Sequence, residues 1–175
     1  LAAWHGDGRK ASLQEIEYKC RQGGLSGHLE AFESGAKKGV ANLLMAFYFR
    51  EADKRTDGEK TFEFTHKSFG EYLTALRLSR FLDILGDEVS RNTDNPDRGW
   101  SLKNALIQMA NMFGPANLDI YIVKFLEREI QRKTGAQVEC IFRAIKCLVE
   151  HVVRASFPID RVEDGPTDFE EKKRW

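Results

Sequence analysis

The chain has 175 residues, of which 42% are hydrophobic and 31% are charged, and its 27 basic and 27 acidic side chains give a formal net charge of zero. This length allows one or two domains, since single domains cluster near about 100 to 150 residues. The neutral balance argues against binding to nucleic acid or anionic lipid driven by overall charge. No apolar run approaches the roughly 18 residues of a membrane span, and no signal-peptide pattern opens the chain. We therefore expect a cytoplasmic protein with no membrane partner.

Both ends of the chain indicate a segment of a longer polypeptide. The first residue is Leu1 rather than methionine, and Trp175 follows directly on the charged run EEKKR. Residues 156–175 are rich in charge and contain Pro166, a composition typical of a mobile connector. We expect this connector to lead into a further part of the parent protein.

Neither the cysteines nor the histidines form a metal-binding pattern. None of the three cysteines lies in a CxxC pair, and Cys140 and Cys147 stand seven apart in an apolar helical pattern that favours buried thiols. None of the four histidines has a second histidine or cysteine at helical ligand spacing. The sequence therefore predicts no metal site.

Motifs of the common catalytic classes are missing from the sequence. There is no GxxxxGK[ST] phosphate loop, no HExxH and no GxSxG elbow. The run HGDGR at 5–9 is a weak match to an anion-binding glycine loop, and an ordinary turn explains it better. We expect this chain not to be an enzyme by itself.

The first third of the chain predicts short helices followed by a β-hairpin. SLQE at 12–15 has the form of a capping box, which predicts a helix over residues 13–21. VANLLMAFYFREA from residue 40 and the alternating TFEFTH at 61–66 flank a polar turn around Asp57-Gly58, and Phe62 and Phe64 fall on one strand face. This order predicts a winged-helix-like subdomain over residues 1–66.

The rest of the chain predicts four amphipathic helices. SFGE at 68–71 is a second capping box, so a helix should begin at Ser68 and run to about Leu85, followed by a loop over residues 86–99. Three further apolar patterns should end at Gly114-Pro115, at Thr134-Gly135 and before Pro158. Short connectors favour antiparallel packing into an α-helical bundle over residues 67–155. The predicted fold class is mainly α: a winged-helix-like subdomain with a β-hairpin, followed by an α-helical bundle.

His66 occupies the predicted junction between the second strand and the helix that begins at Ser68. Unpaired backbone N–H groups and the positive end of the helix dipole make such a place suited to a phosphate. A neutral imidazole can donate one hydrogen bond to a phosphate oxygen while the protein holds its other nitrogen. The residues alone leave open a second interpretation, in which His66 is a structural histidine satisfied within the hinge.

The stretch FEFTHKSFGEYLTALRL resembles the segment that closes the winged-helix subdomain and opens the helical domain in NACHT proteins, which belong to the STAND class of signalling NTPases. Upstream, AAWHGDGR and LLMAFYFREA resemble bacterial members that carry a pentapeptide-repeat tail. The direct resemblance covers residues 2–9 and 40–82, and the helices from 101 to 154 are similar only in general character. The matching residues of the motif are Phe62, Phe64, His66, Ser68, Phe69, Glu71, Tyr72, Leu73 and Ala75.

The resemblance implies a role in nucleotide sensing. His66 would reach the β-phosphate of ADP held by the neighbouring nucleotide-binding domain of the same parent chain. Ser68 and Glu71, the capping-box residues of SFGE, lie at the hinge that this contact would control. Exchange of ADP for ATP would release the subdomain and expose surfaces for homo-oligomerisation. The phosphate loop, the magnesium-binding acidic residues and the sensor arginine of such ATPases are missing here. ATP or ADP with magnesium is therefore expected in the parent and not in this chain, which would be a regulatory module in bacterial signalling or antiviral defence.

Two other functions remain as alternatives. A winged-helix module that binds nucleic acid would use Lys37, Lys38, Lys54 and Arg55, although acidic residues in the predicted wing weaken its attraction for phosphate. A purely structural helical scaffold would join a motor to a sensor, and a change at His66 would then alter stability alone.

Overall fold

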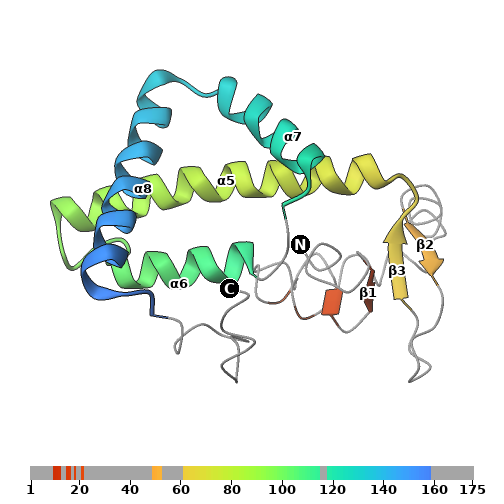
Figure 1. Cartoon of the computed structure of the whole chain (residues 1–175), viewed down its shortest axis with the longest axis horizontal. Helices are drawn as coiled ribbons and strands as arrows, with labels where there is room; N and C mark the ends of the chain where they lie inside the picture. The colour runs from red at the N-terminus through yellow and green to blue at the C-terminus, as the bar shows by residue number, and fades with distance from the viewer. Residues whose placement is uncertain are drawn as a thin grey trace. The chain divides into compact units, whose positions relative to one another are not determined.

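The computed structural model describes residues 10–12, 15, 16, 18, 21, 49–52, 61–114 and 118–158 (Figure 1). The chain divides into two compact units, Leu1–Thr74 and Ala75–Trp175. Most of the described residues are helical, which confirms the mainly α class. Within this described part, no helix is long and apolar enough to cross a membrane.

The first unit contains a small antiparallel sheet. Its strands are β1 (Ala11–Ser12), β2 (Phe49–Ala52) and β3 (Thr61–Phe64), in the order β1-β3-β2. Phe49 pairs with Phe64 and Ala52 with Thr61, so β2 and β3 are the two strands expected of the hairpin. Strand β1, which pairs Ala11 with Phe62, was not predicted. The winged-helix assignment remains a hypothesis, because most of residues 1–60 lie outside the described part.

The first predicted capping box is present. The Ser12 backbone N–H donates to Glu15 Oε2 at 2.7 Å, and the Glu15 N–H donates to Ser12 Oγ at 3.2 Å. Helical geometry follows at Glu15, Ile16, Tyr18 and Arg21. These four residues fall within the helix predicted over residues 13–21, and the other positions of that range lie outside the described part.

Helix α5 spans Lys67–Asp94 and is longer than predicted. It continues through Gly86, so the predicted loop over residues 86–99 is wrong for its first nine positions. A Cβ atom at Gly86 would lie 3.3 Å from Cys140 Sγ and 3.3 Å from the backbone nitrogen of Ile141. Gly86 thus allows α5 to pack closely against the residues around Cys140 and does not end the helix. The apolar face of α5 continues on both sides of Gly86 with the buried Leu85 and Val89.

The chain turns back on the end of α5. The Trp100 N–H donates to the Glu88 carbonyl oxygen at 3.0 Å, and the Asn92 side chain donates to two carbonyl oxygens of the turn. Gly99 has a φ of +70°, a conformation that an L side chain rarely adopts, and a Cβ atom there would strike the Glu88 oxygen. The Trp100 ring lies 6.3 Å from the ring of Phe81 on α5.

The three other predicted helices are confirmed as α6 (Leu102–Phe113), α7 (Ile120–Gln131) and α8 (Gly135–Ala155). Each begins after a side chain that accepts a hydrogen bond from the first turn, namely Ser101, Asp119 and Thr134. Gly114 ends α6 at a φ of +54°. The sequence located these helices through the spacing of their apolar residues and the breaks at Gly114-Pro115, Thr134-Gly135 and Pro158.

The core of the second unit lies where α5, α6 and α8 meet. Helix α6 runs beside the second half of α5, and α8 crosses α5 (Figure 1). The Phe81 and Phe113 rings meet edge to face with centroids 6.3 Å apart. The buried apolar residues of this unit are Ala75, Leu78, Phe81, Leu82, Leu85, Val89, Ala105, Leu106, Ala110, Met112, Ile122, Ile141, Ala144 and Leu148.

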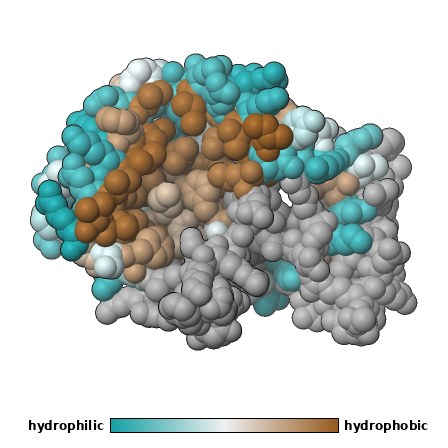
Figure 2. Space-filling view, in the orientation of Figure 1, coloured by the Kyte–Doolittle hydropathy of each residue, from teal (hydrophilic) through white to brown (hydrophobic). Residues whose placement is uncertain are grey.

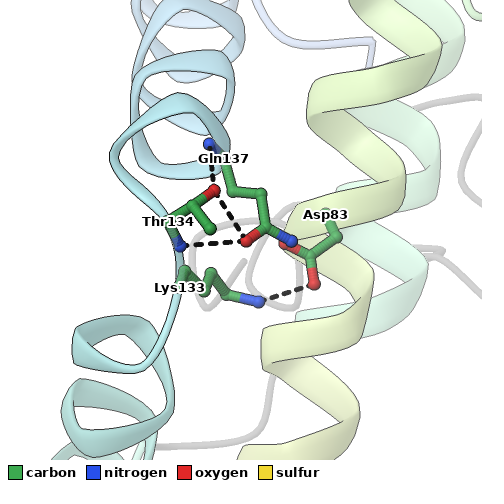
Figure 3. Close-up of polar contacts among 4 residues, drawn as sticks. All are labelled: Asp83, Lys133, Thr134 and Gln137. Atoms are coloured by element: carbon green, nitrogen blue, oxygen red, sulfur yellow. Dashed lines mark hydrogen bonds and ion pairs between the residues drawn. The ribbon is translucent and has the colours of Figure 1, made fainter.

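An ion pair ties the turn between α7 and α8 to α5 (Figure 3). Lys133 Nζ lies 2.5 Å from Asp83 Oδ2, and the lysine side chain is only 9% exposed. The next residue, Thr134, forms a capping box with Gln137, since each side chain accepts from the other's backbone N–H. The same turn therefore starts α8 and anchors it to α5.

Candidate functional site

His66 lies between the end of β3 and the start of α5, as the sequence predicts. Only Thr65 and His66 separate the strand from the helix, and the His66 side chain is exposed. The His66 carbonyl oxygen accepts a hydrogen bond from the Phe69 N–H at 3.0 Å, which closes the first turn. The backbone of His66 is thus fixed by the helix while its imidazole faces solvent.

The helix begins at Lys67, so the predicted start at Ser68 is one residue late. Ser68 consequently lies inside the first turn, where it is exposed, and His66 is the residue that precedes the helix. The side chain of Glu71 is only 4% exposed and lies 3.5 Å from Lys67 Nζ. Of the two residues assigned to the helix cap, Ser68 is therefore exposed to solvent and Glu71 is buried.

Aromatic packing sets the angle between β3 and α5. The rings of Phe64 and Phe69 meet edge to face with centroids 5.8 Å apart. A Cβ atom at Gly70 would lie 2.6 Å from Phe64 Cδ2, closer than packed atoms approach. Gly70 therefore allows the ring of the last strand residue to lie directly on the first turn of the helix.

The chemistry of this junction suits an anion better than a metal ion. The exposed imidazole of His66 stands beside the N-terminal turn of α5, where the helix dipole is positive, and the next residue is the exposed Lys67. Among the residues that the structure describes, no group of three or more His, Cys, Asp and Glu side chains could hold a metal ion. What the junction offers is an exposed histidine beside the positive end of the helix dipole, while the charge of Lys67 is shared with Glu71.

The other sequence-derived candidates lie outside the described residues. These are the run HGDGR at 5–9 and the four basic residues of the nucleic-acid alternative, Lys37, Lys38, Lys54 and Arg55. His151 is half-buried on α8, and Cys140 and Cys147 are half-buried free thiols on the same helix.

One feature of the surface was not predicted. Several apolar residues of α8 are exposed, among them Phe142 at 62%, Val149 at 58% and Val153 at 81%. A signal for this was present in the sequence, because the apolar positions of residues 138–153 extend around more of the helix than one packed face can cover.

Comparison with protein-family models, with curated proteins and with solved structures gave no match. The resemblance to NACHT proteins therefore rests on sequence motifs alone, chiefly the one between Phe62 and Ala75.

Proposed function

We propose that the chain is a regulatory, non-catalytic module of a NACHT-type signalling ATPase. It would couple the nucleotide state of a neighbouring domain to opening and oligomerisation, in bacterial signalling or antiviral defence. The observation that carries the proposal is the exposed imidazole of His66, fixed at a strand-to-helix junction beside the first turn of α5. A side chain in this position is accessible to a phosphate held by another domain.

The packing around His66 supports a role in switching. The β3–α5 junction is held by the Phe64–Phe69 contact and by the close approach at Gly70, so the histidine moves with the strand and the helix together. A bond between His66 and ADP would favour one arrangement of this region against the nucleotide-binding domain. Loss of that bond on exchange would shift the population toward an open arrangement.

The test is His66→Ala in the longer protein that includes the nucleotide-binding domain. A hydrogen bond to a charged group contributes about 1.5 to 3 kcal/mol, so we expect about a 10- to 100-fold loss of ADP affinity and higher spontaneous activity. Isothermal titration with ADP and the rate of ADP release measure the effect.

His151→Ala is the matched control, because this histidine lies on α8 and is half-buried. It should leave ADP affinity unchanged. If His66→Ala also retains the original ADP affinity, the role assigned to His66 is wrong. A lower melting temperature without any change in ADP binding would favour the structural-scaffold alternative.

A further inference from the structure

Helix α8 presents an apolar stripe to solvent. Val138 is 38% exposed, Phe142 62% and Val149 58%, while Ile145 between them is half-buried. We refer to these four residues as the α8 stripe. Figure 2 shows apolar residues gathered in a band on the face formed by α8 and the helices beside it, with hydrophilic residues along its border. Soluble monomers rarely expose an apolar band of this kind unless it binds something.

A groove between α6 and α8 continues the stripe. Its volume is about 340 Å³, and its lining is almost wholly apolar. Ile145 and Val149 belong to both the stripe and the groove. The main lining residues from the two helices are Leu106, Met109, Phe113, Val149 and Val152.

The spacing of the α8 stripe is that of a coiled-coil seam. Its members, Val138, Phe142, Ile145 and Val149, stand four, three and four residues apart. This alternation keeps apolar side chains facing a partner helix. Val152 continues it by three more residues, at the edge of the groove. The pattern therefore indicates that the partner is a helix.

The charges beside the stripe identify which helix fits. Glu139 and Lys146 directly follow seam positions and are exposed. In an antiparallel pair of α8 helices, Phe142 packs opposite Ile145 of the second copy and Val138 opposite its Val149. This register brings Glu139 of each copy to Lys146 of the other, so the ion pair forms twice around the twofold axis.

A parallel pair would lack this complementarity. The neighbours of Glu139 and Lys146 across a parallel seam are Thr134 and Ile141, which carry no charge. The existing pair between Glu139 and Arg143 on the same helix is long at 3.7 Å, and both side chains are more than 60% exposed. Such a pair is weak and does not prevent Glu139 from meeting a second partner.

We propose that α8 is a self-association surface, on which two copies of the chain pack antiparallel through the α8 stripe. This inference is independent of the nucleotide role of His66. The seam has only four apolar layers, so the dimer has micromolar affinity, below that of an obligate interface. It is isologous, because the same patch is used on both copies.

Charge reversal tests the register. Sedimentation velocity of the 175-residue chain over a range of concentrations should show a monomer–dimer equilibrium. Glu139→Lys and Lys146→Glu, made separately, should each weaken dimerisation about tenfold, because each turns two attractive pairs into two repulsive ones. The double variant should restore the original affinity.

Mixing the two single variants gives the sharpest outcome. A Glu139→Lys copy and a Lys146→Glu copy have opposite charges at both pairs, so their heterodimer should form more tightly than either homodimer. Phe142→Glu should abolish association, and circular dichroism should show that the fold is retained, since Phe142 is already exposed. Glu150→Lys reverses an exposed charge on α8 away from the seam and should change nothing.

Two results would overturn the proposal. The chain could remain monomeric throughout the micromolar range, in which case the stripe is covered by something other than a second copy. Alternatively, it could dimerise with an affinity that neither charge reversals nor Phe142→Glu alter, which would place the interface elsewhere.

Discussion

At Gly86, the missing side chain determines how closely α5 and α8 approach. The nearest atoms include the backbone nitrogen of Ile141, which cannot move without moving α8. We predict that Gly86→Leu lowers the free energy of unfolding by about 2 kcal/mol or more, because overpacking outweighs the higher helix propensity of leucine. Urea denaturation followed by circular dichroism measures the loss.

Gly135→Ala is the matched control for Gly86→Leu. Gly135 is the first residue of α8, and a Cβ atom there would meet nothing within 4 Å. This variant should be neutral or slightly stabilising, since alanine is the better helix former. A Gly86→Leu protein as stable as the wild type would show that α5 and α8 can separate without loss.

Arg77 is a second residue whose surroundings lead to a prediction. Burial lowers the pKa of the Arg77 guanidinium, and the positive charge of Arg80 lowers it further. A lowered pKa means that the folded state holds this proton less tightly than the unfolded state, so the charge opposes folding at every pH below the folded pKa. This destabilisation would diminish only as the pH rises through the folded-state pKa of Arg77.

We therefore expect Arg77→Met to raise the melting temperature at neutral pH. Methionine keeps an unbranched apolar stem and a similar helix propensity while removing the guanidinium and its charge. Arg80→Met, at an exposed position, should give a smaller rise because it removes only the repulsion. A fall in melting temperature for Arg77→Met, measured by calorimetry, would mean that the guanidinium is stabilising after all.

At the scale of elements, the turn between α7 and α8 depends on the pair between Lys133 and Asp83. Asp83 Oδ2 accepts from Lys133, whereas Asp83 Oδ1 is buried and has no hydrogen-bond partner among the described residues. The Asp83 side chain is 32% exposed, so removing the lysine would leave a partly buried carboxylate without its counter-charge. We predict that Lys133→Ala lowers the free energy of unfolding by about 1 kcal/mol, near the lower end of the cost of leaving a buried polar group unpaired.

A double-mutant cycle separates the pair from its surroundings. Asp83→Ala combined with Lys133→Ala should cost less than the sum of the single changes. The surface pair between Arg143 and Glu139, in which both side chains are more than 60% exposed, serves for comparison, and Arg143→Ala should cost at most about 1 kcal/mol. Additive effects at Lys133 and Asp83 would show that their contact contributes nothing.

At the scale of the whole molecule, the features that could be predicted from the sequence are those determined by residues close together in the chain. The capping box at Ser12 depends on a residue three positions away and is present, and the apolar spacing that predicted α6, α7 and α8 repeats within each helix. Gly86 was misread because its reason lies more than fifty residues away, at Cys140. Strand β1 was missed because two residues carry no pattern until β3 pairs with them.

The same distinction between local and long-range signals applies to the residues of the candidate site. The position of His66 between strand and helix was predictable from alternation followed by helical periodicity, and the structure confirms it. The exposure of its imidazole and the burial of Glu71 depend on how the unit packs, which no local pattern specifies. The role of His66 in nucleotide sensing remains a prediction from motif resemblance.

The fold-back of Trp100 onto α5 gives the second unit an optical reporter of its own. The indole is half-buried beside Phe81, so its fluorescence emission should shift to longer wavelength when this end of α5 opens to water. The other two tryptophans, Trp4 and Trp175, stand near the ends of the chain, and replacing both with phenylalanine would leave a single emitter. The unfolding of one unit could then be followed by light alone, without any added dye.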